Sequence, residues 1–133
     1  MEKFLPEEYE ILDMVASSLP GNAEPVARPF TAIVINVNAC SKAHRDRQDL
    51  EICLVIPIGT FTGGALVLME TGLVLYLTQG DIAIFRSDDI THLNLHYQGK
   101  RASIVLHSDK EMRQWLRDRN GWADNEMMRT YDL

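Results

Sequence analysis

Short runs rich in β-forming residues, separated by glycine-containing turns, fill the middle of this 133-residue chain. Seven runs follow one another: residues 31–38, 50–58, 65–69, 73–77, 81–85, 91–97 and 101–107. Turn-forming residues recur about every ten residues, a spacing typical of all-β sandwiches and barrels. Because the connections are too short for crossover helices, we expect neighbouring strands to be antiparallel. The sequence therefore predicts a mostly β fold, either an antiparallel barrel or a jelly roll.

A short helix is predicted on each side of this β-rich region. Pro6, followed by two glutamates, is typical of a helix start, and the helix is expected over residues 6–17. Ser108 and Glu111 fit a capping box, so a second helix is expected over residues 109–119. The whole chain is thus one domain with a β core at about residues 31–108.

The charge and cysteine content exclude some classes of protein. Thirteen basic and nineteen acidic residues give a net charge of −6, which disfavours a broadly basic nucleic-acid-binding surface. Cys40 and Cys53 are too few for a disulfide framework, and Cys53 lies in an apolar run typical of a buried thiol. With neither a signal peptide nor a membrane span, we expect a cytoplasmic or nuclear protein that does not bind membranes. Its oligomeric state stays open.

The histidines suggest a metal site. His44 and Asp46 are two residues apart, so on an extended chain both side chains point to one side and can bind one ion. His92 and His96 are the candidates for a third ligand. His92 is favoured, because His96 and Arg101 flank the same expected turn.

That turn, Gln98-Gly99, is expected to be a two-residue hairpin loop. Such a loop would pair the last two runs on one face: His96 with Arg101, Asn94 with Ser103, and His92 with Val105. The alternative is that this polar face is simply the solvated side of an antiparallel sheet.

The order of these residues resembles the Fe(II)/2-oxoglutarate-dependent dioxygenases, a superfamily with a double-stranded β-helix core of the jelly-roll, cupin-like kind. The resemblance covers about residues 31–108 and is most similar to a fungal branch grouped with the TET and J-binding-protein oxygenases. Five segments carry it: His44-Arg45-Asp46, residues 61–66, residues 79–85, Thr91-His92 and Arg101-Ala102-Ser103.

The resemblance implies a catalytic centre and a co-substrate. His44, Asp46 and His92 would be the catalytic facial triad that binds Fe(II) and leaves positions open for 2-oxoglutarate and O2. Arg101 would bind the distal carboxylate of 2-oxoglutarate bidentately, and the Ser103 hydroxyl would add a hydrogen bond. Succinate and a hydroxylated substrate would be the products.

Other polar residues are weaker candidates. Asn36 and Asn38 share one face of the first run and are expected to bind co-substrate or substrate, with capping of the strand edge as the alternative. His96 and His107 are expected to support the ligands or to be structural. Three basic residues lie around the ligand pair, where they are expected either to attract an anionic co-substrate or substrate at the mouth of the site or to form an ordinary solvated face: Lys42, Arg45 and Arg47.

The substrate is the least constrained part of this prediction. The resemblance implies a methylated nucleobase such as 5-methylcytosine, flipped out of its duplex. No aromatic platform or basic stripe supports a nucleic-acid partner independently. A peptide or small-molecule substrate, a cupin-like metalloenzyme without 2-oxoglutarate, and a non-catalytic binding module of the same fold remain the alternatives.

Overall fold

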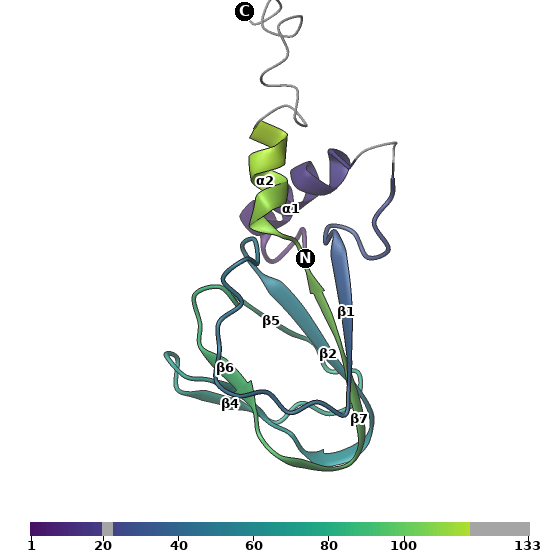
Figure 1. Cartoon of the computed structure of the whole chain (residues 1–133), viewed down its shortest axis with the longest axis vertical. Coiled ribbons are helices and arrows are strands. Elements are labelled where there is room, and N and C mark those ends of the chain that lie inside the picture. Colours follow the sequence, from purple (N-terminus) through teal and green to yellow (C-terminus); the bar gives the residue numbers. More distant parts are fainter. Residues whose placement is uncertain (20–22, 118–133) are drawn as a thin grey trace, which may run out of the picture.

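The computed structural model describes residues 1–19 and 23–117, which form two β-sheets and two helices. Figure 1 shows both helices at one end of the strands, away from the smaller sheet. In chain order the elements are α1 (Pro6–Ser17), β1 (Ala32–Val37), β2 (Cys53–Gly63), β3 (Leu66–Leu68), β4 (Leu73–Leu75), β5 (Ala83–Phe85), β6 (His92–Asn94), β7 (Tyr97–His107) and α2 (Lys110–Arg117).

The larger sheet has the strand order β1-β7-β2-β5 and the smaller sheet the order β4-β3-β6. All the strand pairs are antiparallel, as the short connections predicted. The first and last strands are neighbours, so that Asn36 of β1 lies opposite Ser103 of β7. The predicted mostly β, double-stranded β-helix (jelly-roll) fold with a helix at each end is therefore confirmed. No helix among the residues described could cross a membrane.

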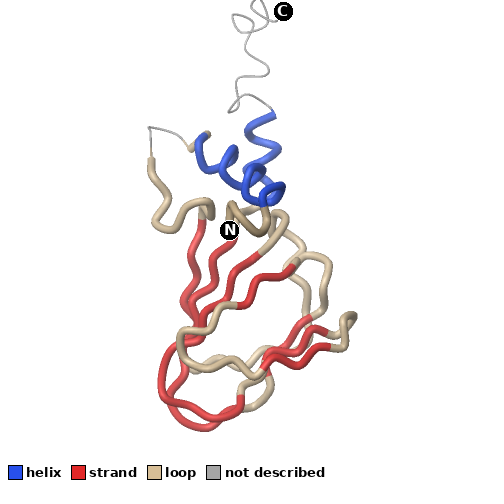
Figure 2. The backbone as a smooth tube through the Cα atoms, turned by 180° about the vertical axis from the view of Figure 1, so that it is seen from behind, coloured by secondary structure: helices blue, strands red, loops and turns tan. Residues whose placement is uncertain are grey.

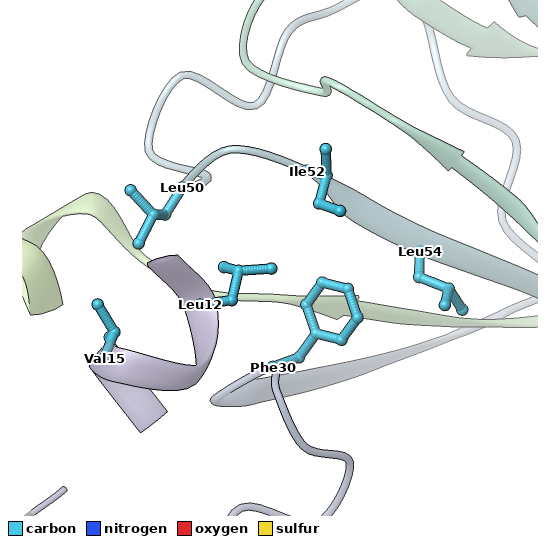
Figure 3. Close-up of a cluster of buried hydrophobic side chains, with 6 residues drawn as sticks. All are labelled: Leu12, Val15, Phe30, Leu50, Ile52 and Leu54. Atoms are coloured by element: carbon cyan, nitrogen blue, oxygen red, sulfur yellow. The ribbon is translucent and has the colours of Figure 1, made fainter. Parts of the chain in front are cut away.

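The helices close one end of the larger sheet, which Figure 2 shows from behind. Leu12 and Val15, one helical turn apart on α1, are both fully buried. Figure 3 shows them beside apolar side chains from the chain leading into β1 and from β2 and its approach: Phe30, Leu50, Ile52 and Leu54. Burial of each such side chain contributes roughly 1.5–3 kcal/mol, so this cluster anchors α1 to the sheet.

A second apolar cluster joins the two sheets. Leu66 and Leu68 of β3 lie in one cluster with Cys53, Ala83 and Phe85 of the larger sheet. Cys53 is buried, as predicted, and burial raises the pKa of its thiol to about 12. Cys53, Leu66 and Phe85 of this cluster also form part of the wall of the cavity described below.

The predicted hairpin at Gln98-Gly99 is wrong. These two residues lie inside β7 and pair with Thr62 and Phe61 of β2, while β6 pairs with β3 in the other sheet. Gly99 has a φ of +107°, and a Cβ there would collide with the carbonyl oxygen of Thr60. The glycine is therefore needed because two long strands approach closely here, and not because the chain turns. The three cross-strand pairs that the hairpin would have formed are therefore absent from the described residues.

The predicted capping box at the start of α2 is also wrong. The Ser108 hydroxyl accepts a hydrogen bond from the Thr31 amide at 3.1 Å, which ties the end of β7 to the start of β1. Asp109 caps the helix instead, because its Oδ1 accepts from the Glu111 amide at 2.8 Å. The helix end expected at residue 119 lies outside the described residues.

Candidate metal centre

The backbone brings the loop after β1 against β6. The amide of His44 donates to the carbonyl of His92 at 3.1 Å, and the amide of His92 donates to that of His44 at 3.0 Å. Further along the loop, the amide of Asp46 donates to the carbonyl of Ser87 at 2.9 Å. Segments almost fifty residues apart in the chain thus become neighbours through main-chain hydrogen bonds.

His44, Asp46 and His92 converge on one point. Their candidate ligand atoms all lie within 4.8 Å of one another. One oxygen of Asp46 is 3.6 Å from Nε2 of His44, and the other is 3.4 Å from Nε2 of His92. These separations are close to those of neighbouring ligands around an ion with ligand distances of about 2.0–2.2 Å. Two imidazoles and a carboxylate are the ligand set typical of mononuclear non-haem ferrous centres.

Each histidine has its second ring nitrogen directed at a main-chain carbonyl. Nδ1 of His44 lies 2.6 Å from the Lys42 carbonyl, and Nδ1 of His92 lies 3.0 Å from the Ile90 carbonyl. A carbonyl oxygen only accepts hydrogen bonds, so Nδ1 carries the proton in both rings. The Nε2 lone pairs are then free to bind a metal, and the carbonyls fix the ring orientations.

These three candidate ligands open into a cavity of about 360 Å³ between the strands. Its volume falls in the range of small-molecule sites. Arg101, Ser103 and Asn36 line the same cavity. On β7, residues 101 and 103 point to the same face because side chains alternate along a strand.

Arg101 is a buried cation. Its residue is 5% exposed, and its guanidinium lies over the rings of Phe61 and Tyr97, at 5.4 and 5.8 Å from their centroids. Among the residues described, no carboxylate pairs with it and its Nε has no hydrogen-bond partner. Burial lowers its pKa. A buried guanidinium without a counter-charge is costly, and an anionic ligand would relieve that cost.

Gly64 leaves space beside this guanidinium, because a Cβ there would lie only 3.3 Å from Nε of Arg101. Ser103 is buried near it, opposite Asn36 on β1. Asn38 differs from the expectation, because its side chain is not part of the cavity wall. Its contact with the site is through the main chain, where its amide donates to the Arg101 carbonyl at 2.8 Å.

His96 and Arg45 are not part of the cavity wall. The His96 ring stacks against Tyr97, and the three residues that could hold a metal ion include His92 instead. Arg45, predicted to attract an anion at the mouth, pairs with Glu70 and donates to the Thr91 hydroxyl at 2.9 Å. Its charge is therefore already engaged within the chain.

A second polar group lies in the cavity, and of its two members only His107 is among the residues singled out from the sequence. Asp49 and His107 both line it, and Nδ1 of His107 lies 3.2 Å from Oδ1 of Asp49. The other Asp49 oxygen accepts a hydrogen bond from the Ser87 hydroxyl. Burial raises the pKa of Asp49. Alternation along β7 places His107 on the same face as residues 101 and 103, whereas no sequence pattern indicates Asp49.

Comparisons with known proteins show a similarity of fold and no similarity to a known family by sequence. No family model matches the chain, and no curated protein matches its sequence. A similar solved structure is that of NgTET1 in complex with 5mC DNA, with a TM-score of 0.66 and 19% identity. The match covers 82% of this chain and 46% of the NgTET1 chain, so this chain spans less than half of its length. At this level of identity the likeness shows the fold.

Proposed function

We propose that this chain is an Fe(II)- and 2-oxoglutarate-dependent dioxygenase domain. One observation carries the proposal: the His44, Asp46 and His92 side chains share a cavity with Arg101, a buried cation without a counter-charge. This chemistry needs ligands for a ferrous ion and a cation that binds the carboxylate of 2-oxoglutarate, and both would lie in one cavity. The likeness in fold to NgTET1 supports the same assignment.

The donor set fits a ferrous ion. Nε2 of His44, Nε2 of His92 and one carboxylate oxygen of Asp46 would be its ligands, and the carbonyls behind the two rings would keep them oriented. When bound, iron supplies the activation of O2 that couples conversion of 2-oxoglutarate to succinate and CO2 with oxidation of a substrate C–H bond.

Arg101 and Ser103 would bind the distal carboxylate of 2-oxoglutarate. The guanidinium provides a planar pair of donors that matches a carboxylate, and the serine hydroxyl can add a third hydrogen bond. Phe61 and Tyr97 cover the guanidinium and keep water from competing for it. The co-substrate carboxylate would thus supply the negative charge that is missing beside Arg101.

For the substrate we propose a methylated nucleobase, extruded from its strand into the cavity. The NgTET1 structure contains 5mC DNA, and the cavity here carries a second polar pair, Asp49 and His107. A carboxylate and an imidazole can accept from and donate to the polar edge of a base. The hydrophobic cavity residues Val34 and Val105 would contact its ring.

The test is succinate formation by the Fe(II)-loaded protein supplied with 2-oxoglutarate in air, with a duplex containing 5-methylcytosine and with the unmodified duplex. Succinate that rises only with the methylated duplex supports both the chemistry and the substrate. Succinate that is insensitive to methylation overturns the substrate assignment alone. If the protein binds the metal but forms no succinate beyond the level of Asp46→Ala, it is a non-catalytic module.

A further inference from the structure

The carboxylate of Glu70, in the turn between β3 and β4, joins the two segments that carry the metal ligands. Thr91 donates to it twice, from its amide at 2.7 Å and from its hydroxyl at 2.6 Å. Arg45 donates to it from Nη2. The Nε of Arg45 also donates to the Thr91 hydroxyl at 2.9 Å, which closes the network.

These partners adjoin the ligands in sequence. Arg45 lies between His44 and Asp46, and Thr91 immediately precedes His92. In extended segments, neighbouring side chains point to opposite sides. The ligands accordingly line the cavity, and the network lies on the other side of the backbone bridge between His44 and His92.

The network around Glu70 differs electrostatically from an ordinary surface ion pair. An isolated exposed pair contributes little, with a median of about 0–1 kcal/mol, because water and salt screen it. Here three donors from two segments converge on one carboxylate. Hydrogen bonds from Thr91 and then from Arg45 lower the pKa of Glu70 to about 2. The carboxylate is therefore ionised throughout the neutral range.

We propose that Glu70 is a positioning residue of the metal centre, holding the segment of His44 and Asp46 at a fixed distance from His92. Glu70 itself does not belong to the metal-ligating group. Its effect is on the geometry of the three ligands before an ion binds, and hence on metal affinity. This inference rests on the proposed function, because it concerns the same metal centre.

The alternative is that Glu70 only stabilises the fold, and the chain contains a suitable control. Glu51 pairs with Arg86 at 2.6 Å and with Arg113 at 3.7 Å. This second carboxylate also joins separate segments, near α2, and it does not line the cavity. Glu51→Gln and Glu70→Gln therefore each remove a carboxylate that joins separate segments through ion pairs, and only Glu70 adjoins the ligands.

The experiment is a titration of the full chain with Mn(II) alone, followed by electron paramagnetic resonance. Glu70→Gln places an amide NH2 against donors, so the network breaks while the side-chain size is kept. We expect Mn(II) affinity to fall about 10- to 100-fold, as for other groups that orient metal ligands. Glu51→Gln should stay within about twofold of the wild type.

Two further readouts separate positioning from stability. The visible spectrum of the Co(II)-saturated protein reports ligand geometry and should change in Glu70→Gln but not in Glu51→Gln. Thr91→Ser keeps the hydroxyl and should retain Mn(II) affinity. Thr91→Val lacks the hydroxyl and should bind Mn(II) more weakly. Thermal unfolding of the metal-free proteins should be shifted about equally by the two glutamate substitutions.

The outcomes distinguish this inference from the function on which it rests. If the wild type binds no Mn(II), the proposed metal centre is overturned, and the role of Glu70 with it. If the wild type binds Mn(II) and Glu70→Gln binds it equally well, only the positioning role is overturned. Equal loss of affinity in both glutamine variants would likewise make Glu70 merely structural.

Discussion

Replacing Arg101 by methionine should abolish binding of 2-oxoglutarate without unfolding the protein. A bidentate contact consists of two charge-assisted hydrogen bonds, each contributing about 1.5–3 kcal/mol. Loss of about 3–6 kcal/mol corresponds to a Kd raised roughly a hundred- to ten-thousand-fold. The free protein loses the contacts of the cation with Phe61 and Tyr97, about 0.5–1 kcal/mol each. The substitution also removes an unpaired buried charge, and this stabilises the free protein by several kcal/mol.

The assay is calorimetric titration of 2-oxoglutarate into Mn(II)-loaded protein without oxygen, with urea unfolding of the metal-free variant alongside. Arg86→Met, which removes an ion-paired arginine outside the cavity, is the control and should leave the Kd unchanged. Arg101→Lys keeps the charge but not the planar pair of donors. Its Kd for 2-oxoglutarate should lie between those of the wild type and Arg101→Met. The reasoning is refuted if Arg101→Met binds 2-oxoglutarate like the wild type, or if it unfolds as readily as a core-cavity variant.

Three further predictions concern the core, the thiols and pH. Leu12→Ala should lower the free energy of unfolding by about 2–5 kcal/mol in urea, because Leu12 is fully buried; a loss below about 1 kcal/mol would mean that α1 is not anchored as described. Iodoacetamide at pH 8 should label the exposed Cys40 and spare the buried Cys53, whose pKa is about 12; mass spectrometry showing equal labelling in the folded protein would contradict this. The pKa of Glu70 is lowered from 4.5 to about 2, so its stabilising effect is complete above about pH 4.5 and is lost as the pH falls towards 2. The stability difference between the wild type and Glu70→Gln should shrink between pH 5 and pH 3, and a constant difference would show that the network does not form.

The fold was predictable because strand signals are local. The β-rich runs, the helix at Pro6 and the antiparallel pairing all follow from residue type and connection length. The hairpin at Gln98-Gly99 failed because glycine signals either a turn or a close approach of strands, and only the register with β2 distinguishes them. Ser108 was misassigned for a similar reason, since its partner, Thr31, is far away in the sequence.

The site could be predicted in part from alternation along strands. His44 and Asp46, and likewise Arg101 and Ser103, are two residues apart, so each pair shares a face wherever its segment is extended. Their convergence with His92 depends on main-chain hydrogen bonds between distant segments, which no local pattern encodes. The contacts of Asp49 and Glu70 were not predictable, because each depends on partners from other parts of the fold.

Anaerobic addition of Fe(II) and then 2-oxoglutarate to the full chain tests whether the metal and the co-substrate bind in the same cavity. Chelation of the metal by the co-substrate produces a visible charge-transfer band that neither component gives alone. We expect this band in the wild type and in Arg86→Met, and its loss in His92→Ala and in Arg101→Met. A protein that binds Fe(II) but gives no band with 2-oxoglutarate, or a band unaffected by Arg101→Met, would contradict this expectation.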